Sequence, residues 1–251
     1  MSLPQPPGDE VRLFALDPDI DRRAAALRFA SGGRVQIKDF LVEESARTIL
    51  QILSRETPWG VAWQAEKDGP HGLRRQEFAA LTPAEKRLVG EKITTAMRGR
   101  GYAFTYGQYR MLNAYLQGWG EHQGLDYLME HINSEPMLDL VREVTGISQL
   151  QKADAQATLF GPTHFLAMHD DSHVADASGI AYVMNFCGED WRPDWGGYLV
   201  FYDDEGDVVA GFRPRFNALN LFRVPQKHSV SYVPPFAPAA RFAISGWFRD
   251  R

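Results

Sequence analysis

Two histidines and an aspartate have the types and spacing of a metal site. His169 and Asp171 stand two residues apart, and His228 follows Asp171 by 57 residues (228 − 171). In an extended strand, residues i and i+2 point to the same face, so the imidazole of His169 and the carboxylate of Asp171 can converge on one ion. Two histidines and one carboxylate form the facial triad of non-haem Fe(II) oxygenases, which leaves coordination positions open. The spacing alone is a weak indication, because many sequences match it by chance.

A second candidate feature is an arginine on an apolar segment near the C-terminus. Arg241 and Ser245 are four residues apart on a predicted strand, so they share a face. An arginine fork and a hydroxyl are suited to binding a carboxylate. If Arg241 points inward it is a buried charge that requires an anionic partner. That partner is either a bound carboxylate or one of the 32 Asp and Glu residues of the chain in a structural salt bridge.

The elements that must position these residues are short apolar runs separated by Gly, Pro and Asp clusters. This pattern is typical of a sandwich or barrel rather than of alternating βα units. We therefore expect a mainly β fold with a helical N-terminal part. The predicted strands span residues 179–186, 197–202, 208–212, 217–224, 228–233 and 241–248.

The N-terminal half has mostly helical patterns. Helices are predicted at 19–30, around 46–53, from the capping box Thr82-Pro-Ala-Glu85 to about residue 98, and at 124–144 with a break at Pro136; one strand is predicted at 34–37. Residues 102–113, which include Tyr106, Tyr109 and Arg110, are interpreted as a loop at the substrate entrance or as an edge strand. We predict a flexible lead-in at 1–10 and a single domain at 11–251. Its helical layer lies mostly at 11–150 and its β core mostly at 151–251.

Composition excludes several classes of function. The 251 residues are 44% hydrophobic and 24% charged, with a net charge of −5, which argues against a nucleic-acid or membrane-surface binder. The single cysteine, Cys187, excludes an intramolecular disulfide and a multi-cysteine zinc site. No apolar run approaches the ~18 residues of a membrane span. The N-terminal residues lack the pattern of a secretory signal, so a cytoplasmic location is expected.

Residues from about 155 to 249 resemble the prolyl-hydroxylase-like branch of the 2-oxoglutarate/Fe(II)-dependent dioxygenases. Six blocks in the same order carry the resemblance: FLAMHDD (165–171), IAYVMNF (180–186), DWGGYL (194–199), NALNLF (217–222), KHSV (227–230) and RFAISGWF (241–248). The final block is most similar to that of the subgroup that hydroxylates prolines on translation-related proteins. Residues 55–150 show no comparable match.

The resemblance implies a double-stranded β-helix, or jelly roll, that uses Fe(II), 2-oxoglutarate as cosubstrate and O₂, with ascorbate in support. Arg241 would pair with the distal carboxylate of 2-oxoglutarate, and Ser245 would be a second contact. Asn185 stands where many relatives carry a tyrosine that also contacts this carboxylate. The implied iron ligands are His169, Asp171 and His228.

The implied reaction is hydroxylation of an unactivated carbon. Relatives that halogenate replace the carboxylate ligand with a small residue, so Asp171 favours hydroxylation. The resemblance favours a prolyl residue of a protein or peptide as substrate, while a free amino acid or small metabolite is accommodated equally well. Two rivals stay open: a non-catalytic metal-binding or scaffolding protein on the same fold, to which Asn185 gives weight, and a zinc hydrolase, for which no general base is evident beside the motif.

Overall fold

The structure is a computed structural model that describes residues 13–99, 101–120, 122–172, 179–188 and 190–250; the predicted lead-in at 1–10 lies outside them. The helices are α1 (Arg22–Gly32), α2 (Glu43–Gln51), α3 (Arg75–Ala80), α4 (Pro83–Arg98), α5 (Met111–Gln117), α6 (Gln123–Ile132) and α7 (Glu135–Thr145), with a π-helical turn η1 (Ile52–Glu56) and a 3₁₀ turn η3 (Pro193–Trp195). The strands are β1 (Arg34–Lys38), β2 (Gly60–Ala65), β3 (Asp68–Leu73), β4 (Ala103–Tyr109), β5 (Lys152–Ala153), β6 (Gln156–Phe160), β7 (Phe165–His169), β8 (Ile180–Asn185), β9 (Leu199–Tyr202), β10 (Val208–Phe212), β11 (Ala218–Arg223), β12 (His228–Val230) and β13 (Arg241–Arg249).

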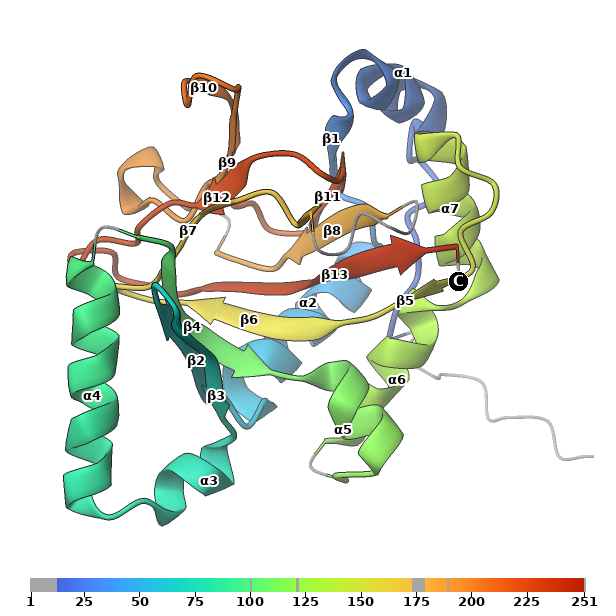
Figure 1. Ribbon diagram of the computed structural model, residues 1–251. Helices are drawn as coiled ribbons and strands as arrows, with labels where there is room; N and C mark the ends of the chain where they lie inside the picture. The colour runs from blue at the N-terminus through green and yellow to red at the C-terminus, as the bar shows by residue number, and fades with distance from the viewer. Residues whose placement is uncertain (1–12, 100, 121, 173–178, 189, 251) are drawn as a thin grey trace, which may run out of the picture.

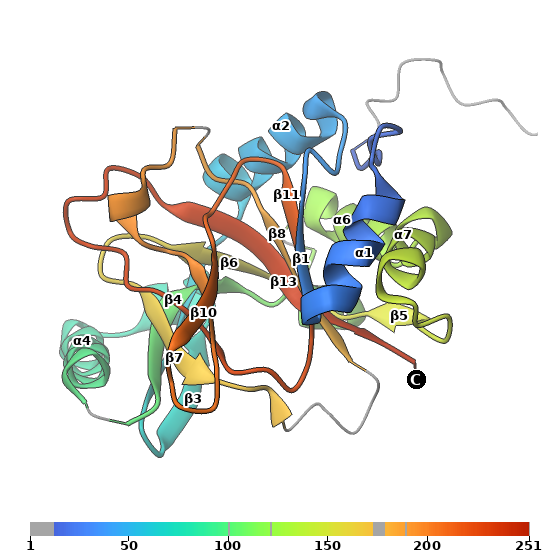
Figure 2. The same cartoon turned by 90° about the horizontal axis from the view of Figure 1, so that it is seen from above.

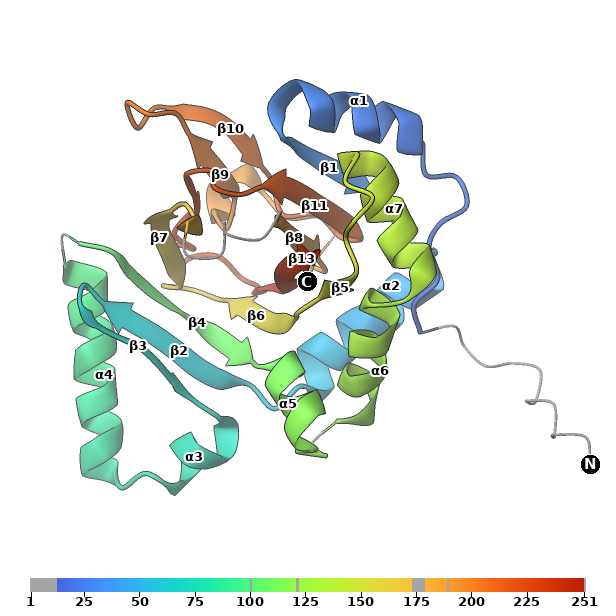
Figure 3. The same ribbon diagram turned by 45° about the vertical axis from the view of Figure 1, so that its right-hand side comes forward.

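The strands form one antiparallel sheet that curls into a nearly closed jelly roll (Figure 1; Figure 3). The strand order is β1-β11-β8-β13-β6-β4-β7-β12-β9-β10, so β1 and β10 are the two ends of the path. The β2–β3 hairpin joins through β4, and β5 joins β13. The predicted mainly β jelly roll with N-terminal helices is confirmed.

The main hydrophobic core lies between the helices and the β1-β11-β8-β13 part of the sheet. Strand β8 is buried at five of its six positions, and β11 at five of six, because helices cover the face that the barrel interior does not. Tyr182 and Phe248 pack ring against ring at 4.8 Å between centroids. Helices α6 and α7 bury one apolar face each, and Figure 2 shows them beside α1 and α2, away from β7 and β10. This layer holds β8 and β13 in the register that the site needs.

Several local predictions are confirmed by the described residues. Helix α4 begins with the predicted capping box, in which the Thr82 Oγ1 accepts from the Glu85 N–H at 3.3 Å and the Glu85 carboxylate accepts from the Thr82 N–H at 2.8 Å. The predicted break near Pro136 separates α6 from α7. The C-terminal strands lie where the apolar runs placed them.

The N-terminal half contributes more to the sheet than its helical pattern indicated. Residues 103–109 form strand β4, which pairs with β2, β6 and β7 and is therefore interior rather than a loop or an edge. The β2–β3 hairpin was not predicted either. Polar residues within β4 weaken its apolar pattern, although they are accommodated in the sheet: Thr105 is 1% exposed, and Gln108 donates to Gln156. Pairing with distant strands, which local sequence does not encode, decides these segments.

Among the described residues, no helix has both the length and the apolar character that a membrane crossing requires.

Candidate metal centre and adjoining pocket

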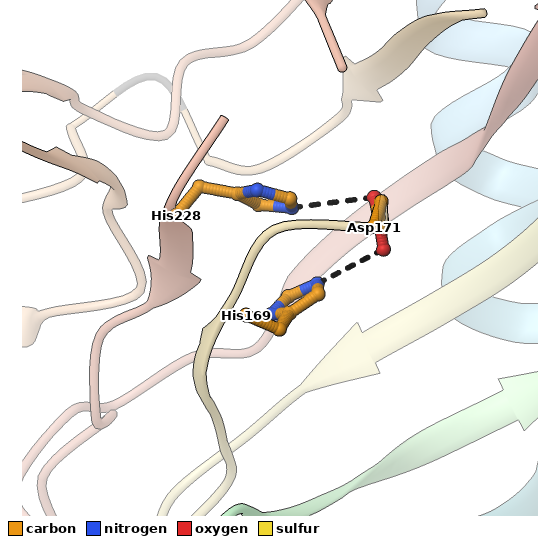
Figure 4. Close-up of side chains that lie close together, drawn as sticks. All are labelled: His169, Asp171 and His228. Carbon is orange, nitrogen blue, oxygen red and sulfur yellow. Dashed lines mark ion pairs between the residues drawn. The ribbon is translucent and has the colours of Figure 1, made fainter. Parts of the chain in front are cut away.

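The three predicted metal ligands come together at the end of one strand pair. His169 is the last residue of β7, His228 is the first of β12, and the two are directly paired in the ladder. The Nε2 atom of His169 lies 3.5 Å from Asp171 Oδ1, and that of His228 lies 3.6 Å from Asp171 Oδ2 (Figure 4). One ligand atom from each residue falls within 4.8 Å of the others.

Asp171 reaches the cluster by a turn rather than by strand alternation. Strand β7 ends at His169, and Asp171 has a φ of 57°, in the left-handed region. This conformation is uncommon outside glycine but is tolerated by aspartate. Asp170 stabilises the turn, because its Oδ1 accepts from the Ser172 N–H at 2.9 Å. The turn, rather than the predicted strand alternation, therefore brings the Asp171 carboxylate to the two histidines.

The hydrogen bonds of the two histidines direct their free nitrogens toward Asp171. The Nδ1 atom of His169 lies 2.9 Å from the Ala167 carbonyl, and that of His228 lies 2.7 Å from the Gln226 carbonyl. Each Nδ1–H therefore donates to the main chain, and each Nε2 keeps a lone pair. Burial, with the neighbouring His169, lowers the pKa of His228 to about 4, so its ring is neutral at pH 7.

The Nε2 atoms of two imidazoles and the carboxylate of Asp171 therefore face one another. Asp171 and His228 are 6% and 5% exposed, so water does not readily compensate this arrangement. A cation between the three groups would satisfy all of them, and the 2-His-1-carboxylate set is the one that non-haem iron(II) uses. The residues fit such an ion.

Trp247 adds a contact that sequence analysis did not resolve. Its indole Nε1–H donates to Asp171 Oδ2 at 3.3 Å. Hydrogen bonds of this kind orient metal ligands and maintain their charge. Trp247 belongs to β13, the same strand as Arg241, so β13 contacts both the cluster and the pocket behind it.

The cluster opens into a cavity of about 610 Å³ inside the barrel. This volume lies in the range of small-molecule sites. Arg241 and Ser245 of β13 both line it, as the same-face spacing predicted. The other contributors include residues of β4, β6, β7 and β8, among them Tyr106, Thr158 and Leu166.

Arg241 is a buried cation without a counter-ion among the described residues. Its side chain is 1% exposed, its Nε–H donates to Asn185 Oδ1 at 2.8 Å, and its guanidinium lies 5.3 Å from the centroid of the Phe160 ring. Its buried Nη1 has no hydrogen-bond partner in the described part of the chain. Burial lowers the pKa of Arg241 to about 10. The structural salt bridge that the sequence left open is not found in the described part of the chain, so the residues fit an anionic ligand.

Asn185 lies behind Arg241 rather than in the cavity wall. It is 2% exposed, and it is not one of the described residues that line the cavity. Its Oδ1 accepts the hydrogen bond from the Arg241 Nε–H. A contact between Asn185 and a cosubstrate therefore stays a prediction, and in the structure Asn185 orients the Arg241 guanidinium.

Two tyrosines of the unpredicted strand region line the cavity. Tyr102 lies 5.9 Å from His169 between ring centroids, and Tyr106 stacks on Phe160 at 5.1 Å. Burial raises the pKa of Tyr102 to about 12 and raises that of Tyr106 as well, so both phenols are neutral donors. Tyr109 and Arg110, which sequence analysis grouped with them, line a different depression on the other side of the hairpin.

Comparison with known proteins agrees with this geometry. Residues 155–249 match the family described as the 2OG-Fe(II) oxygenase superfamily. This segment contains the ligand cluster, Asn185, Arg241 and Ser245. This segment is therefore similar to the 2-oxoglutarate/iron(II)-dependent oxygenases. The matched family consists of dioxygenase enzymes, and the match implies Fe(II), 2-oxoglutarate and O₂.

The similarity to solved structures with the same fold covers nearly the whole chain. A prolyl-4-hydroxylase from Pseudomonas putida is 16% identical, with 94% of this chain and 95% of that chain covered and a TM-score of 0.56. A 2OG-Fe(II) oxygenase family oxidoreductase from Burkholderia pseudomallei is 11% identical, with 93% and 92% covered and a TM-score of 0.57. A Trichoplax adhaerens prolyl hydroxylase in complex with a hypoxia inducible factor peptide fragment is 16% identical, with 91% and 90% covered and a TM-score of 0.58.

At these identities the likeness establishes the fold. A search of the curated proteins found no match.

Proposed function

We propose that this oxygenase hydroxylates an unactivated carbon of an uncharged residue in a protein or peptide, with a prolyl residue as the leading candidate. The observation that carries the proposal is that a set of metal-ligand atoms and a buried guanidinium with an unused hydrogen-bond donor line the same cavity. Three lone-pair donors converge on one point, and a buried guanidinium without a counter-ion among the described residues lines the same space.

In this proposal His169, Asp171 and His228 hold iron(II), and Trp247 orients the carboxylate of Asp171. Three protein ligands leave positions open for the cosubstrate and for oxygen. When bound, iron(II) would activate O₂: one oxygen atom would enter the succinate that forms from 2-oxoglutarate with loss of carbon dioxide, and the other would enter the substrate C–H bond as hydroxyl. Retention of Asp171 supports hydroxylation rather than halogenation.

Arg241 binds the distal carboxylate of 2-oxoglutarate, and Ser245 gives a second polar contact. The Nη1 group has no other partner among the described residues, so the ligand satisfies a donor that is otherwise buried and unpaired. Asn185 holds the guanidinium through its Nε–H. Placing the charge before the ligand arrives lowers the ordering cost of binding.

The cavity lining favours a peptide residue over a free amino acid. Among the described residues that line it, Arg241 is the only lysine or arginine. A free amino acid would bring a second carboxylate that requires its own cation, whereas a residue within a peptide has an uncharged main chain. Tyr102, Tyr106 and Trp247 offer aromatic walls, which suit an apolar ring such as that of proline.

The test is binding and turnover measured on the same preparations. Protein prepared without oxygen and loaded with Fe(II) should bind 2-oxoglutarate by calorimetry and, under air, form succinate. His169→Ala should lose iron and turnover, and Arg241→Ala should retain iron but lose 2-oxoglutarate binding. His71→Ala, a partly exposed histidine outside the cluster, is the matched control and should retain both activities.

The substrate class is tested by mass spectrometry of proline-containing peptides and free amino acids after incubation. Gain of one oxygen atom on a prolyl residue supports the proposal. Hydroxylation of free amino acids alone would overturn the peptide assignment. Retention of zinc with hydrolytic activity, or iron-loaded protein that binds no 2-oxoglutarate, would overturn the oxygenase proposal itself.

A further inference from the structure

A second concentration of positive charge lies outside the oxygenase cavity, at the seam of the barrel. Strands β1 and β10 are the two ends of the sheet path, and each is paired on one side only in the described residues. A surface groove of about 770 Å³ lies between them, lined by the C-terminal end of α1, residues of β1 and the end of β10. Figure 3 shows β10 and β1 on the same side of the molecule, with α1 beside β1.

The groove is strongly basic. Its lining contains four arginines and, among the described residues, no aspartate or glutamate: Arg28, Arg34, Arg213 and Arg215. The chain as a whole has a net charge of −5, so this groove departs from the average charge of the molecule. None of the four guanidinium groups lies in an ion pair with a described carboxylate, although Arg213 and Arg215 also border a depression that contains Asp17, Asp39 and Glu43.

Two of these arginines are positioned by a buried polar network. Asn220 is 0% exposed, and its Oδ1 accepts from Gln36 Nε2 at 2.9 Å. The same Gln36 amide donates to the Arg213 carbonyl at 3.1 Å, and its Oε1 accepts from the Arg215 Nε–H at 2.9 Å. The network holds Arg215 by one edge and leaves the outer nitrogens of its fork for another partner.

The guanidinium groups of Arg34 and Arg213 likewise have no neutralising partner in the described part of the chain. Arg34 donates to Gln226 Oε1 at 3.1 Å and lies over the Phe201 ring at 5.1 Å. The Nε atom of Arg213 is buried and has no hydrogen-bond partner in the described part of the chain. A buried donor without a partner is costly, so it indicates a ligand that would accept from it.

We propose that this groove binds the phosphoryl group of a small phosphorylated molecule. A phosphate carries up to two charges and presents three acceptor oxygens, so it can engage two arginine forks at once, whereas a carboxylate presents two oxygens and one charge. The volume is that of a small-molecule site. The arginines gather in one groove rather than along an extended stripe, which favours a small ligand over a nucleic acid. The site is independent of the oxygenase cavity.

The test is calorimetric titration with inorganic pyrophosphate at constant ionic strength. The double variant Arg213→Gln/Arg215→Gln should weaken pyrophosphate binding about tenfold or more, because two charge-assisted contacts are lost. The matched control Arg55→Gln/Arg87→Gln removes two exposed arginines outside the groove and should bind as the wild type does. An unchanged melting temperature and unchanged 2-oxoglutarate binding establish that each variant is folded.

Arg28→Gln provides an independent variant, because Arg28 is exposed on α1 and lies outside the Gln36 network. It should weaken pyrophosphate binding about threefold or more if the groove is the site. Equal binding in the wild type and all groove variants, or no binding by the wild type, would overturn the proposal. Equally tight binding of citrate would overturn the phosphoryl assignment, and tighter binding of a single-stranded RNA through the same arginines would overturn the small-molecule assignment.

Discussion

Replacement of Arg241 by methionine tests two effects of the buried cation separately: how much it destabilises the ligand-free fold and how much it contributes to 2-oxoglutarate binding. The pKa of Arg241 falls from 12.5 to about 10 because the guanidinium is desolvated. At about 1.4 kcal/mol per pKa unit, the charged form costs the ligand-free fold about 3 kcal/mol. Because the unfolded pKa is higher than the folded one, this cost is fully present below pH 10 and disappears only as the pH rises towards 12.5.

Methionine has a similar length and no charge, so it removes that cost. It also leaves Asn185 Oδ1 without its donor, which costs about 1–3 kcal/mol. We therefore expect ligand-free Arg241→Met to be as stable as the wild type or more stable by up to about 2 kcal/mol. The same variant should lose 2-oxoglutarate affinity by a factor of about 30 or more, since removal of one partner of a desolvated charge pair costs about 2–5 kcal/mol.

Urea denaturation of metal-free protein and calorimetry of anaerobic Fe(II)-loaded protein measure the two effects. Arg249→Met on the same strand is the contrasting control. Arg249 pairs with the Asp154 carboxylate at 2.7 Å, so its removal leaves a mostly buried acid with the Trp247 N–H but without its cation and should destabilise the fold by about 1 kcal/mol or more. Destabilisation of Arg241→Met by more than about 2 kcal/mol would refute the reasoning, because it would mean that the guanidinium has a structural partner.

Three further predictions follow from single contacts. Trp247→Phe removes the hydrogen bond to Asp171 and should weaken iron(II) binding about 10–100-fold, measured by anaerobic metal titration. Because the folded pKa of His228 is about 4 against 6.5, metal-free protein should lose about 3 kcal/mol as the pH falls from 6.5 to 4 in urea titrations, and His228→Gln should show a flatter profile. Thr82→Ala removes the N-cap of α4 and should lower the melting temperature by about 2–4 °C, while Thr82→Ser should not.

The chemistry of the site was predictable because its residues carry specific requirements. The site combines a His-x-Asp pair, a later histidine and an arginine on an apolar strand. The first three suit a metal ion, and the buried arginine requires an anion. The order and spacing of six sequence blocks indicated the family in which these residues occur together. The structure brings these residues into one cavity. What the sequence could not give is how Asp171 reaches the cluster, because a single left-handed residue after β7 replaces the expected strand alternation.

The supporting contacts were less predictable for a physical reason. Asn185 was predicted as a cosubstrate contact because it stands where relatives carry a tyrosine, and its hydrogen bond from Arg241 was not part of that prediction. The hydrogen bond from Trp247 to Asp171 joins residues 76 positions apart and depends on the curl of the sheet. Such distances are set by barrel closure, which no local pattern encodes.

Two parts of the chain line the cavity, and only one of them matches the oxygenase family. Residues 155–249, which match the oxygenase family, supply the metal cluster and Arg241. The region from the β2–β3 hairpin to β4, which lies outside that match, supplies Pro70, Tyr102 and Tyr106 to the same cavity. Because the first set is tied to iron and cosubstrate, it has little freedom to vary with the substrate. Substrate choice is therefore expected to depend on the second set, in which Tyr102 lies beside His169 and Tyr106 belongs to β4, a strand that pairs with β7.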